Sequence, residues 1–213
     1  MKAPAPRHTL GPQDVELLQR DTAFQGFFRV DVLTLRHRRF DGGWLGPMTR
    51  ELFMRQPAVG VLAWDPHTDE VLLVEQFRVG ALAGRGTPWC LEIIAGIVDR
   101  DDETLEQVAR RETAEEAGLV LDQLLPLPSY LPSPGGSDER LHLFLAPVSL
   151  AGAGGVFGVA NEHEDIRAVK MPLAEAAARL DAGEIDNAAS MIALLWLQLH
   201  HVALRARFCG SSA

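Results

Sequence analysis

Residues 110–119 place several charged side chains at helical spacing. Glu115 and Glu116 lie three and four positions after Glu112, so on a helix the three carboxylates point the same way. Such like charges repel one another and destabilise an isolated helix by roughly a few tenths of a kcal/mol per pair. Hard divalent cations prefer oxygen ligands, and Mg²⁺ binds through a few carboxylates together with substrate phosphates. The spacing therefore predicts a divalent-cation site, in which Arg111 could pair with one carboxylate and fix its rotamer.

A longer pattern surrounds this cluster. Its matching positions are, in order, Gly96, Glu103, Arg111, Glu112, Glu115, Glu116, Gly118 and Leu119. They resemble the signature of the Nudix family, G-x5-E-x7-R-E-U-x-E-E-x-G-U, in which U is aliphatic. Two departures occur: six residues instead of five separate Gly96 from Glu103, and Thr113 replaces an aliphatic residue. The extra residue falls in the loop at 99–102, where insertions are well tolerated. A solvated acidic helix is the other interpretation, and eight matches at fixed spacing disfavour it.

Segments outside this box narrow the resemblance. Residues 91–96 (LEIIAG), 133–139 (SPGGSDE), 161–166 (NEHEDI) and 184–201 are similar to bacterial ADP-ribose pyrophosphatases. The group that hydrolyses GDP-mannose shares the SPGG element and much of the acidic loop, so it stays an alternative. A non-catalytic nucleotide-binding regulator is disfavoured, because such proteins tend to lose the glutamates of the box.

The resemblance implies a mixed α/β (α+β) fold, the Nudix α/β/α sandwich with a mixed sheet between helices. It also implies two domains: residues 1–56 as a β-rich part for dimerisation and substrate binding, and residues 57–213 as the hydrolase domain. In this subfamily the N-terminal part exchanges between subunits, so a homodimer is expected. The implied reaction is Mg²⁺-dependent hydrolysis of ADP-ribose to AMP and ribose 5-phosphate, with Mn²⁺ as an alternative metal.

The resemblance also assigns the metal ligands. Glu112 and Glu116 would bind the metal together with the backbone carbonyl of Ala95. Glu115 is either a further ligand or a carboxylate that orients the others. Glu164, in the acidic loop, matches a metal-associated carboxylate. For each of these glutamates the simpler interpretation is a solvated surface charge.

The catalytic base is sought in the loop that follows the glycine-rich residues 152–158. Hydrolysis needs a group that deprotonates the attacking water, and a carboxylate beside a metal can do so. By resemblance this base is Glu162, while His163 is a rival base on chemistry alone. Glycines beside acidic residues suit a loop that closes on substrate, although solvated loops commonly carry such charges as well.

Further residues match positions that contact the substrate in the family. Arg55 and Arg78 could clamp phosphate through their guanidinium groups, or could simply form surface salt bridges. Phe28 could stack on a base, although a lone phenylalanine is more often part of a core. The complete set of expected substrate-binding residues is Phe28, Arg29, Arg50, Glu51, Arg55, Arg78, Ile97, Ser133, Pro134, Gly135 and Glu139.

The composition of the chain limits the kinds of protein that could carry this site. The chain has 213 residues, of which 47% are hydrophobic, and its formal net charge is −9. This is ample for a packed core, whereas the acidic balance disfavours nucleic acid as a partner. The two cysteines, Cys90 and Cys209, form no metal-binding pattern and fit a reducing compartment. No secretory signal or membrane-spanning run is found, so we expect a cytoplasmic protein that does not bind membranes.

The elements that must position the site follow from local patterns. A strand at 27–35 precedes a turn at 41–43, and residues 58–64 and 71–77 suggest a hairpin. The helix at 103–117 carries the carboxylates, and Gly118 would end it. Residues 1–12 are expected to be loose, and 152–158 to form a loop. The remaining expected elements are strands at 89–98, 141–148 and 166–171 and helices at 172–180 and 188–205.

Overall fold

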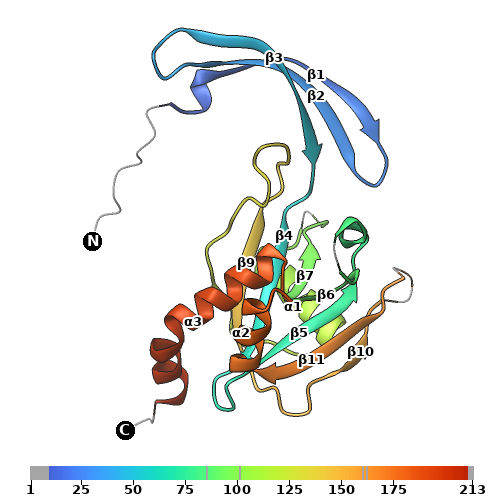
Figure 1. Cartoon of the computed structure of the whole chain (residues 1–213), viewed down its shortest axis with the longest axis vertical. Coiled ribbons are helices and arrows are strands. Elements are labelled where there is room, and N and C mark those ends of the chain that lie inside the picture. Colours follow the sequence, from blue (N-terminus) through green and yellow to red (C-terminus); the bar gives the residue numbers. More distant parts are fainter. Residues whose placement is uncertain (1–9, 85, 101, 160, 162, 211–213) are drawn as a thin grey trace. The chain divides into compact units, whose positions relative to one another are not determined.

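The computed structural model describes residues 10–84, 86–100, 102–159, 161 and 163–210. In it the chain divides into two compact units, and each is described by itself (Figure 1). The first unit contains the chain up to Arg55 together with Ser133–Glu139. The second unit contains Gln56–Pro132 and the chain from Arg140 onward.

The first unit is a three-stranded antiparallel sheet that follows a short 3-10 helix, η1 (Pro12–Asp14). Its strands, in the order in which they pair, are β1 (Val15–Gln25), β2 (Arg29–Arg38) and β3 (Trp44–Met54). The expected strand at 27–35 is therefore β2, which starts two residues later because 26–28 form the turn from β1. Neither β1 nor β3 was predicted, since their sequences lack regular apolar alternation.

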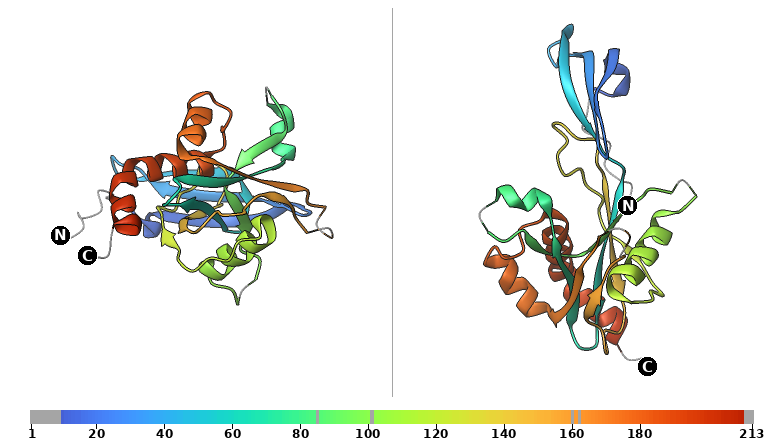
Figure 2. Two further views of the ribbon diagram at one scale, coloured as in Figure 1. Left: turned by 90° about the horizontal axis from the view of Figure 1, so that it is seen from below. Right: turned by 90° about the vertical axis from the view of Figure 1, so that its right-hand side faces the viewer.

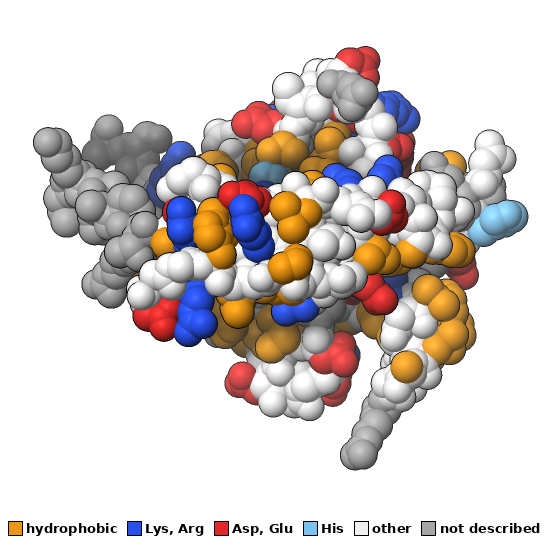
Figure 3. Space-filling view, turned by 90° about the horizontal axis from the view of Figure 1, so that it is seen from above, with side chains coloured by type: hydrophobic (Ala, Val, Ile, Leu, Met, Phe, Trp, Pro, Cys, Tyr) orange, Lys and Arg blue, Asp and Glu red, His pale blue; other side chains and the backbone are white. Residues whose placement is uncertain are grey.

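A buried polar cluster around Asp31 holds part of this sheet together. Asp31 is fully buried and accepts hydrogen bonds from Arg20 (2.5 Å), Arg29 (2.7 Å) and Thr22 (3.0 Å). The hydrogen bond from Arg29 is the main reason why the pKa of Asp31 falls to about 2. Large apolar side chains of this unit are instead exposed, among them Leu17, Phe24, Phe27, Phe40 and Leu45. On the face seen in Figure 3, hydrophobic side chains lie among positively charged ones.

The second unit is built on a mixed sheet. Its path runs β10-β11-β5-β4-β9-β8, with β6 paired to β5 and β7 paired to β4. β4 and β9 are parallel, whereas the other pairs are antiparallel. The strands are β4 (Ala58–Asp65), β5 (Glu70–Phe77), β6 (Trp89–Glu92), β7 (Ile94–Ile97), β8 (Leu125–Pro126), β9 (Leu141–Pro147), β10 (Gly155–Phe157) and β11 (Ile166–Pro172).

Helices cover both faces of this sheet, which confirms the expected sandwich (Figure 2). One core cluster, which includes Val61 and Val74, packs under α1, while another, which includes Leu62 and Leu73, packs under α2 and α3. Alternate residues of β4 and β5 thus point to opposite layers, as the two-residue period of a strand requires. The helical segments are η2 (Val79–Ala83), α1 (Leu105–Ala117), α2 (Leu173–Asp181) and α3 (Ala188–Cys209).

Two expectations about local structure need correction. The glycine-rich segment 152–158 is not only a loop, because Gly155–Phe157 form β10 and pair with the start of β11. The single strand expected at 89–98 is two strands, β6 on β5 and β7 on β4, separated at Ile93. The presence of β10 and the division of 89–98 into two strands both depend on pairing with strands far away in the sequence. Local sequence patterns do not show such pairing. No helix among the described residues is long and apolar enough to span a membrane.

Candidate functional site

Both ends of α1 are fixed by local interactions. Thr104 forms a capping box with Gln107, since its hydroxyl accepts from the Gln107 amide and its own amide donates to the Gln107 side chain. Gly118 ends the helix in the left-handed conformation, with φ of 64°. Thr113, which departs from the family pattern, is buried and donates its hydroxyl to the carbonyl of Ala109 (2.7 Å). The helix therefore tolerates this polar residue without leaving a buried group unpaired.

The carboxylates of α1 lie against β7. The Oε2 atom of Glu116 accepts a hydrogen bond from the backbone amide of Ala95 at 3.2 Å. Glu112 packs so closely on Gly96 that a Cβ atom there would lie 2.0 Å from the Glu112 carboxyl carbon. A Cβ atom at position 96 would therefore force the Glu112 carboxylate to move, whereas glycine lets the carboxylate and the β7 backbone meet.

Arg111 connects the acidic residues around the helix. Its guanidinium donates to Glu112 at 2.8 Å, to Glu115 at 3.2 Å and to Glu103 at 3.2 Å. Burial disfavours the charged guanidinium, but the hydrogen bond to Glu103 and the nearby negative charges outweigh it and raise the pKa of Arg111. Glu103, the residue after the inserted loop position, is therefore in place to pair with Arg111 despite the insertion.

Burial changes the protonation of the two innermost carboxylates. It is the main cause that raises the pKa of Glu112 to about 7 and that of Glu116 to about 8. The charges of Glu112 and Glu164 further raise the pKa of Glu116, and Arg78 lowers it. Like charges gathered in a buried place are stabilised by a cation, so these residues are electrostatically suited to a metal ion.

The oxygen atoms around Glu112 and Glu116 are the kind of ligand that a divalent metal ion takes. No three His, Cys, Asp or Glu side chains within the described part of the chain are already arranged as a metal-binding group. Glu112 is paired with Arg111, and Glu116 with the amide of Ala95. The oxygens of Glu112, Glu116 and the Ala95 carbonyl nevertheless lie on adjoining parts of α1 and β7, and an all-oxygen set of this kind fits a hard divalent cation.

The raised pKa values predict how stability depends on pH. In the metal-free protein Glu112 and Glu116 bind protons more tightly when folded than when unfolded, so their contribution is fully present below about pH 4.5 and is lost as pH rises through about 7 to 8. These two groups should therefore lower Tm between pH 5 and 8. Calorimetry of E116Q should show a smaller decline, and an unchanged slope would contradict the assignment.

Gly96→Ala tests the close approach of α1 to β7. The added methyl would displace the Glu112 carboxylate or separate the helix from the strand, because the carboxyl carbon lies within 2.0 Å of it. We expect about 100-fold lower kcat/KM, in line with the cost of misplacing a reacting group by about 1 Å. Gly86→Ala, which meets no atom within 4 Å, is the control. Wild-type activity of Gly96→Ala would show that the approach is not needed.

The acidic loop reaches the site through Glu164. Its Oε2 atom accepts from the backbone amide of Val159 (3.1 Å), and its charge raises the pKa of both Glu112 and Glu116. His163, the rival base, adopts a positive φ of 57°. Glu162, the expected catalytic base, lies outside the described residues. Arg78 donates a hydrogen bond to Glu92 at 2.6 Å, and its positive charge lowers the pKa of Glu116. It therefore belongs to the same region of the second unit.

Within the first unit, three of the expected substrate-binding residues come together. The guanidinium of Arg55 lies 4.8 Å from the centre of the Phe28 ring and pairs with Glu139 at 2.9 Å. Phe28 is 37% exposed, so it is not a core residue. Phe53, which the sequence did not single out, contacts the Phe28 ring edge to face, with 5.0 Å between the ring centres. The strand that carries Phe53, β3, was not predicted either, so no sequence pattern marked this residue.

The segment 133–139 is held against β3 in the same unit. The amide of Gly136 donates to the carbonyl of Ser133 (3.1 Å), which closes a turn over Pro134 and Gly135. The amide of Phe53 then donates to the carbonyl of Gly136 (2.8 Å). The SPGG element is therefore a turn, and it places Glu139 beside Arg55.

Other expected substrate-binding residues are not part of this group. Arg29 is used in the buried network of Asp31. Arg50 and Glu51 are exposed on β3, and Arg50 donates to the carbonyl of Thr49. Ile97 ends β7 in the second unit.

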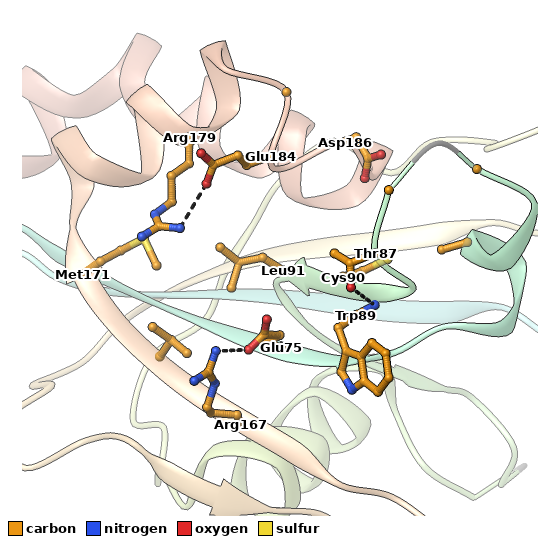
Figure 4. Close-up of a pocket in the computed structure, with 15 residues that line it drawn as sticks. Glu75, Thr87, Trp89, Cys90, Leu91, Arg167, Met171, Arg179, Glu184 and Asp186 are labelled. Carbon is orange, nitrogen blue, oxygen red and sulfur yellow. Dashed lines mark hydrogen bonds and ion pairs between the residues drawn. The ribbon is translucent and has the colours of Figure 1, made fainter.

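A pocket of about 460 Å³ lies elsewhere in the second unit, on the face of the sheet that α2 covers (Figure 4). Arg167 pairs with Glu75 on one wall, and Arg179 pairs with Glu184 on another. None of the expected site residues lines this pocket. Its size alone does not make it the reaction site, because the buried carboxylates are on the opposite face.

Comparisons with known proteins identify the family of this chain. The NUDIX domain model matches residues 54–194. The ADP-ribose pyrophosphatase of Escherichia coli K12 is 45% identical over 92% of this chain and 94% of its own length. The GDP-mannose pyrophosphatase of Shigella flexneri is 30% identical over 89% and 98%. A solved ADP compounds hydrolase aligns with a TM-score of 0.65 at 18% identity, over 90% of this chain and 98% of that one, and so supports the fold alone. The chain belongs to the Nudix hydrolase family.

Proposed function

We propose that this protein hydrolyses the diphosphate bond of ADP-ribose to give AMP and ribose 5-phosphate. The observation that carries the proposal is the pair formed by the half-buried carboxylate of Glu112 and the buried carboxylate of Glu116, which lie against β7 and have raised pKa values. A divalent cation can replace the protons of such a pair, and a cation bound there can also contact a diphosphate. The greater identity to an ADP-ribose pyrophosphatase than to a GDP-mannose pyrophosphatase favours ADP-ribose as the substrate.

In this proposal Glu112, Glu116 and the Ala95 carbonyl hold Mg²⁺, or Mn²⁺ in its place, with Glu164 close by. Bound there, the ion neutralises the diphosphate and acts as a Lewis acid on it. Glu115 serves as a further ligand or as an orienting carboxylate, and Arg111 keeps the rotamers of its glutamate partners fixed. Glu162 takes the proton of the attacking water.

The remaining residues are proposed to bind the nucleotide sugar. Arg78 contacts the diphosphate, since only part of its donor capacity is used by Glu92. Three side chains of the first unit are proposed to bind the adenosine and ribose parts: the guanidinium of Arg55, the ring of Phe28 and the carboxylate of Glu139. The other proposed substrate-binding residues are Arg29, Arg50, Glu51, Ile97, Ser133, Pro134 and Gly135.

We also propose that residues 1–56 form a dimerisation and substrate domain and residues 57–213 the hydrolase domain of a homodimer. The first unit exposes large apolar side chains and buries the carboxylate of Asp31, so its sheet lacks an apolar core of its own. A second copy could cover these side chains. Native mass spectrometry should then give about twice the 23.3 kDa of the chain, and a monomer at micromolar concentration would contradict the proposal.

The two free cysteines support a cytoplasmic location.

Product analysis tests the substrate. The purified protein is mixed with ADP-ribose or GDP-mannose, with Mg²⁺ or with EDTA, and the products are identified by phosphorus NMR. We expect AMP and ribose 5-phosphate, formed only with metal and faster than GMP is formed from GDP-mannose. Faster hydrolysis of GDP-mannose would keep the mechanism and favour the second candidate, to which the 30% identical relative points. Binding without hydrolysis of either compound would contradict an enzymatic function.

A further inference from the structure

The side chain of Gln76, near the end of β5, carries an unpaired buried donor. Gln76 is 6% exposed. Its amide Nε2 is the one buried side-chain nitrogen or oxygen without a hydrogen-bond partner in the described part of the chain. A buried donor that lacks an acceptor costs free energy, because it has lost its hydrogen bonds to water. An acceptor brought by a ligand would remove this cost.

The strand period places Gln76 on the same face as the acidic site. Leu72 and Val74 of β5 belong to the core cluster under α1, and Gln76 follows them with the same two-residue period. Glu75 points the other way and lines the pocket shown in Figure 4. Arg78 continues in extended backbone, with φ of −127° and ψ of 113°, so it shares the face of Gln76.

Neighbouring strands bring the site residues to this end of β5. On β6, Glu92 is opposite Val74 and accepts from Arg78. On β11, Ala168 is opposite Val74, so Ile166, two residues earlier, is the side chain on this face nearest the strand's start. The acidic loop with Glu164 leads directly into Ile166. Gln76 therefore lies between the Arg78–Glu92 pair and the entry of the acidic loop.

We infer that Gln76 donates a hydrogen bond from Nε2 to a non-bridging phosphate oxygen of the substrate, beside Arg78. The inference rests on the proposed function, since it concerns a nucleoside diphosphate at that site. The carboxylates of this face already accept hydrogen bonds: Glu92 from Arg78, Glu112 from Arg111 and Glu116 from Ala95. A diphosphate brings new acceptor oxygens, and an amide can meet them without a buried charge of its own.

Gln76→Met tests this role, because methionine has a similar length but no donor. The measurements are kcat/KM for ADP-ribose with Mg²⁺, the affinity for its methylene-bridged diphosphate analogue, and Tm with and without that analogue. We expect about 10- to 100-fold weaker binding and lower kcat/KM, as for one hydrogen bond to a charged group. Tm of the ligand-free protein should be unchanged or higher, since Gln76→Met removes an unpaired buried donor.

Gln76→Glu is the second variant, with nearly the same shape but an acceptor in place of the donor. It should weaken analogue binding more than Gln76→Met does, because a carboxylate repels phosphate. Glu75→Gln, on the opposite face, is the matched control and should keep kcat/KM within about twofold, since its ion pair with Arg167 is partly exposed and lies away from the carboxylates of α1.

Wild-type affinity in both Gln76 variants would overturn the inference. So would a lower Tm of the ligand-free variants combined with an unchanged ligand-induced shift, which is the behaviour of a purely structural residue. Failure of the proposed substrate is seen separately, in the wild-type protein. If the wild type prefers GDP-mannose, the same variants are compared on that compound, because its diphosphate offers the same oxygens.

Discussion

Replacing Glu116 by glutamine should lower kcat/KM for ADP-ribose about 1000-fold and raise the Mg²⁺ concentration needed for half-maximal activity. The glutamine oxygen can still accept from the Ala95 amide, so the position of α1 should be kept. What is lost is a negative charge at a buried place that suits a cation, and a divalent ion there supplies several kcal/mol of transition-state stabilisation, or about 10³-fold in rate. The measurement is a Mg²⁺ titration of initial rates.

Glu106→Gln provides the control for this experiment. It makes the same chemical change on the same helix, but Glu106 is exposed in the first turn of α1, away from the carboxylate group. Its Mg²⁺ titration should match that of the wild type. An unchanged titration of Glu116→Gln would refute the ligand role of Glu116.

The part of the site on α1 could be predicted from the sequence because its geometry is local. The helical period alone puts Glu112, Glu115 and Glu116 on one side, and the capping residues at Thr104 and Gly118 lie in the same segment. The helix expected at 103–117 runs from Leu105 to Ala117, so its bounds differ from the expectation only at the first turn.

The electrostatics of the site could not be predicted in this way. The high pKa of Glu116 comes first from burial, and this burial depends on how α1 packs on β7. The approach of Glu112 to Gly96 has the same origin. Gln76 is a further example, since its unpaired amide is apparent only when the neighbouring strands are in place.

The first unit was the hardest part to predict. Sequence patterns identify strands by an apolar face, but this sheet buries Asp31 and exposes Leu17 and Phe24. β1 and β3 are held by pairing with β2, and Asp31 of β2 also accepts hydrogen bonds from Arg20 and Thr22 of β1.

Replacing Glu162 by glutamine should lower kcat for ADP-ribose by about 10²- to 10⁴-fold, the range found for a general base. Glutamine has the same shape but cannot take a proton from water, so ADP-ribose affinity, measured by calorimetry on the inactive variant, should change little. This split distinguishes Glu162→Gln from Glu116→Gln, whose defect should depend on the Mg²⁺ concentration.

His163→Gln separates the two candidate bases. It changes the adjacent residue, and it should keep kcat within a few-fold of the wild type if Glu162 is the base. The negative charge of Glu164 raises the pKa of both Glu112 and Glu116. Glu164→Gln should therefore alter the dependence of the rate on Mg²⁺ concentration and leave the base in place. Full activity of Glu162→Gln together with loss of activity in His163→Gln would assign the base to His163.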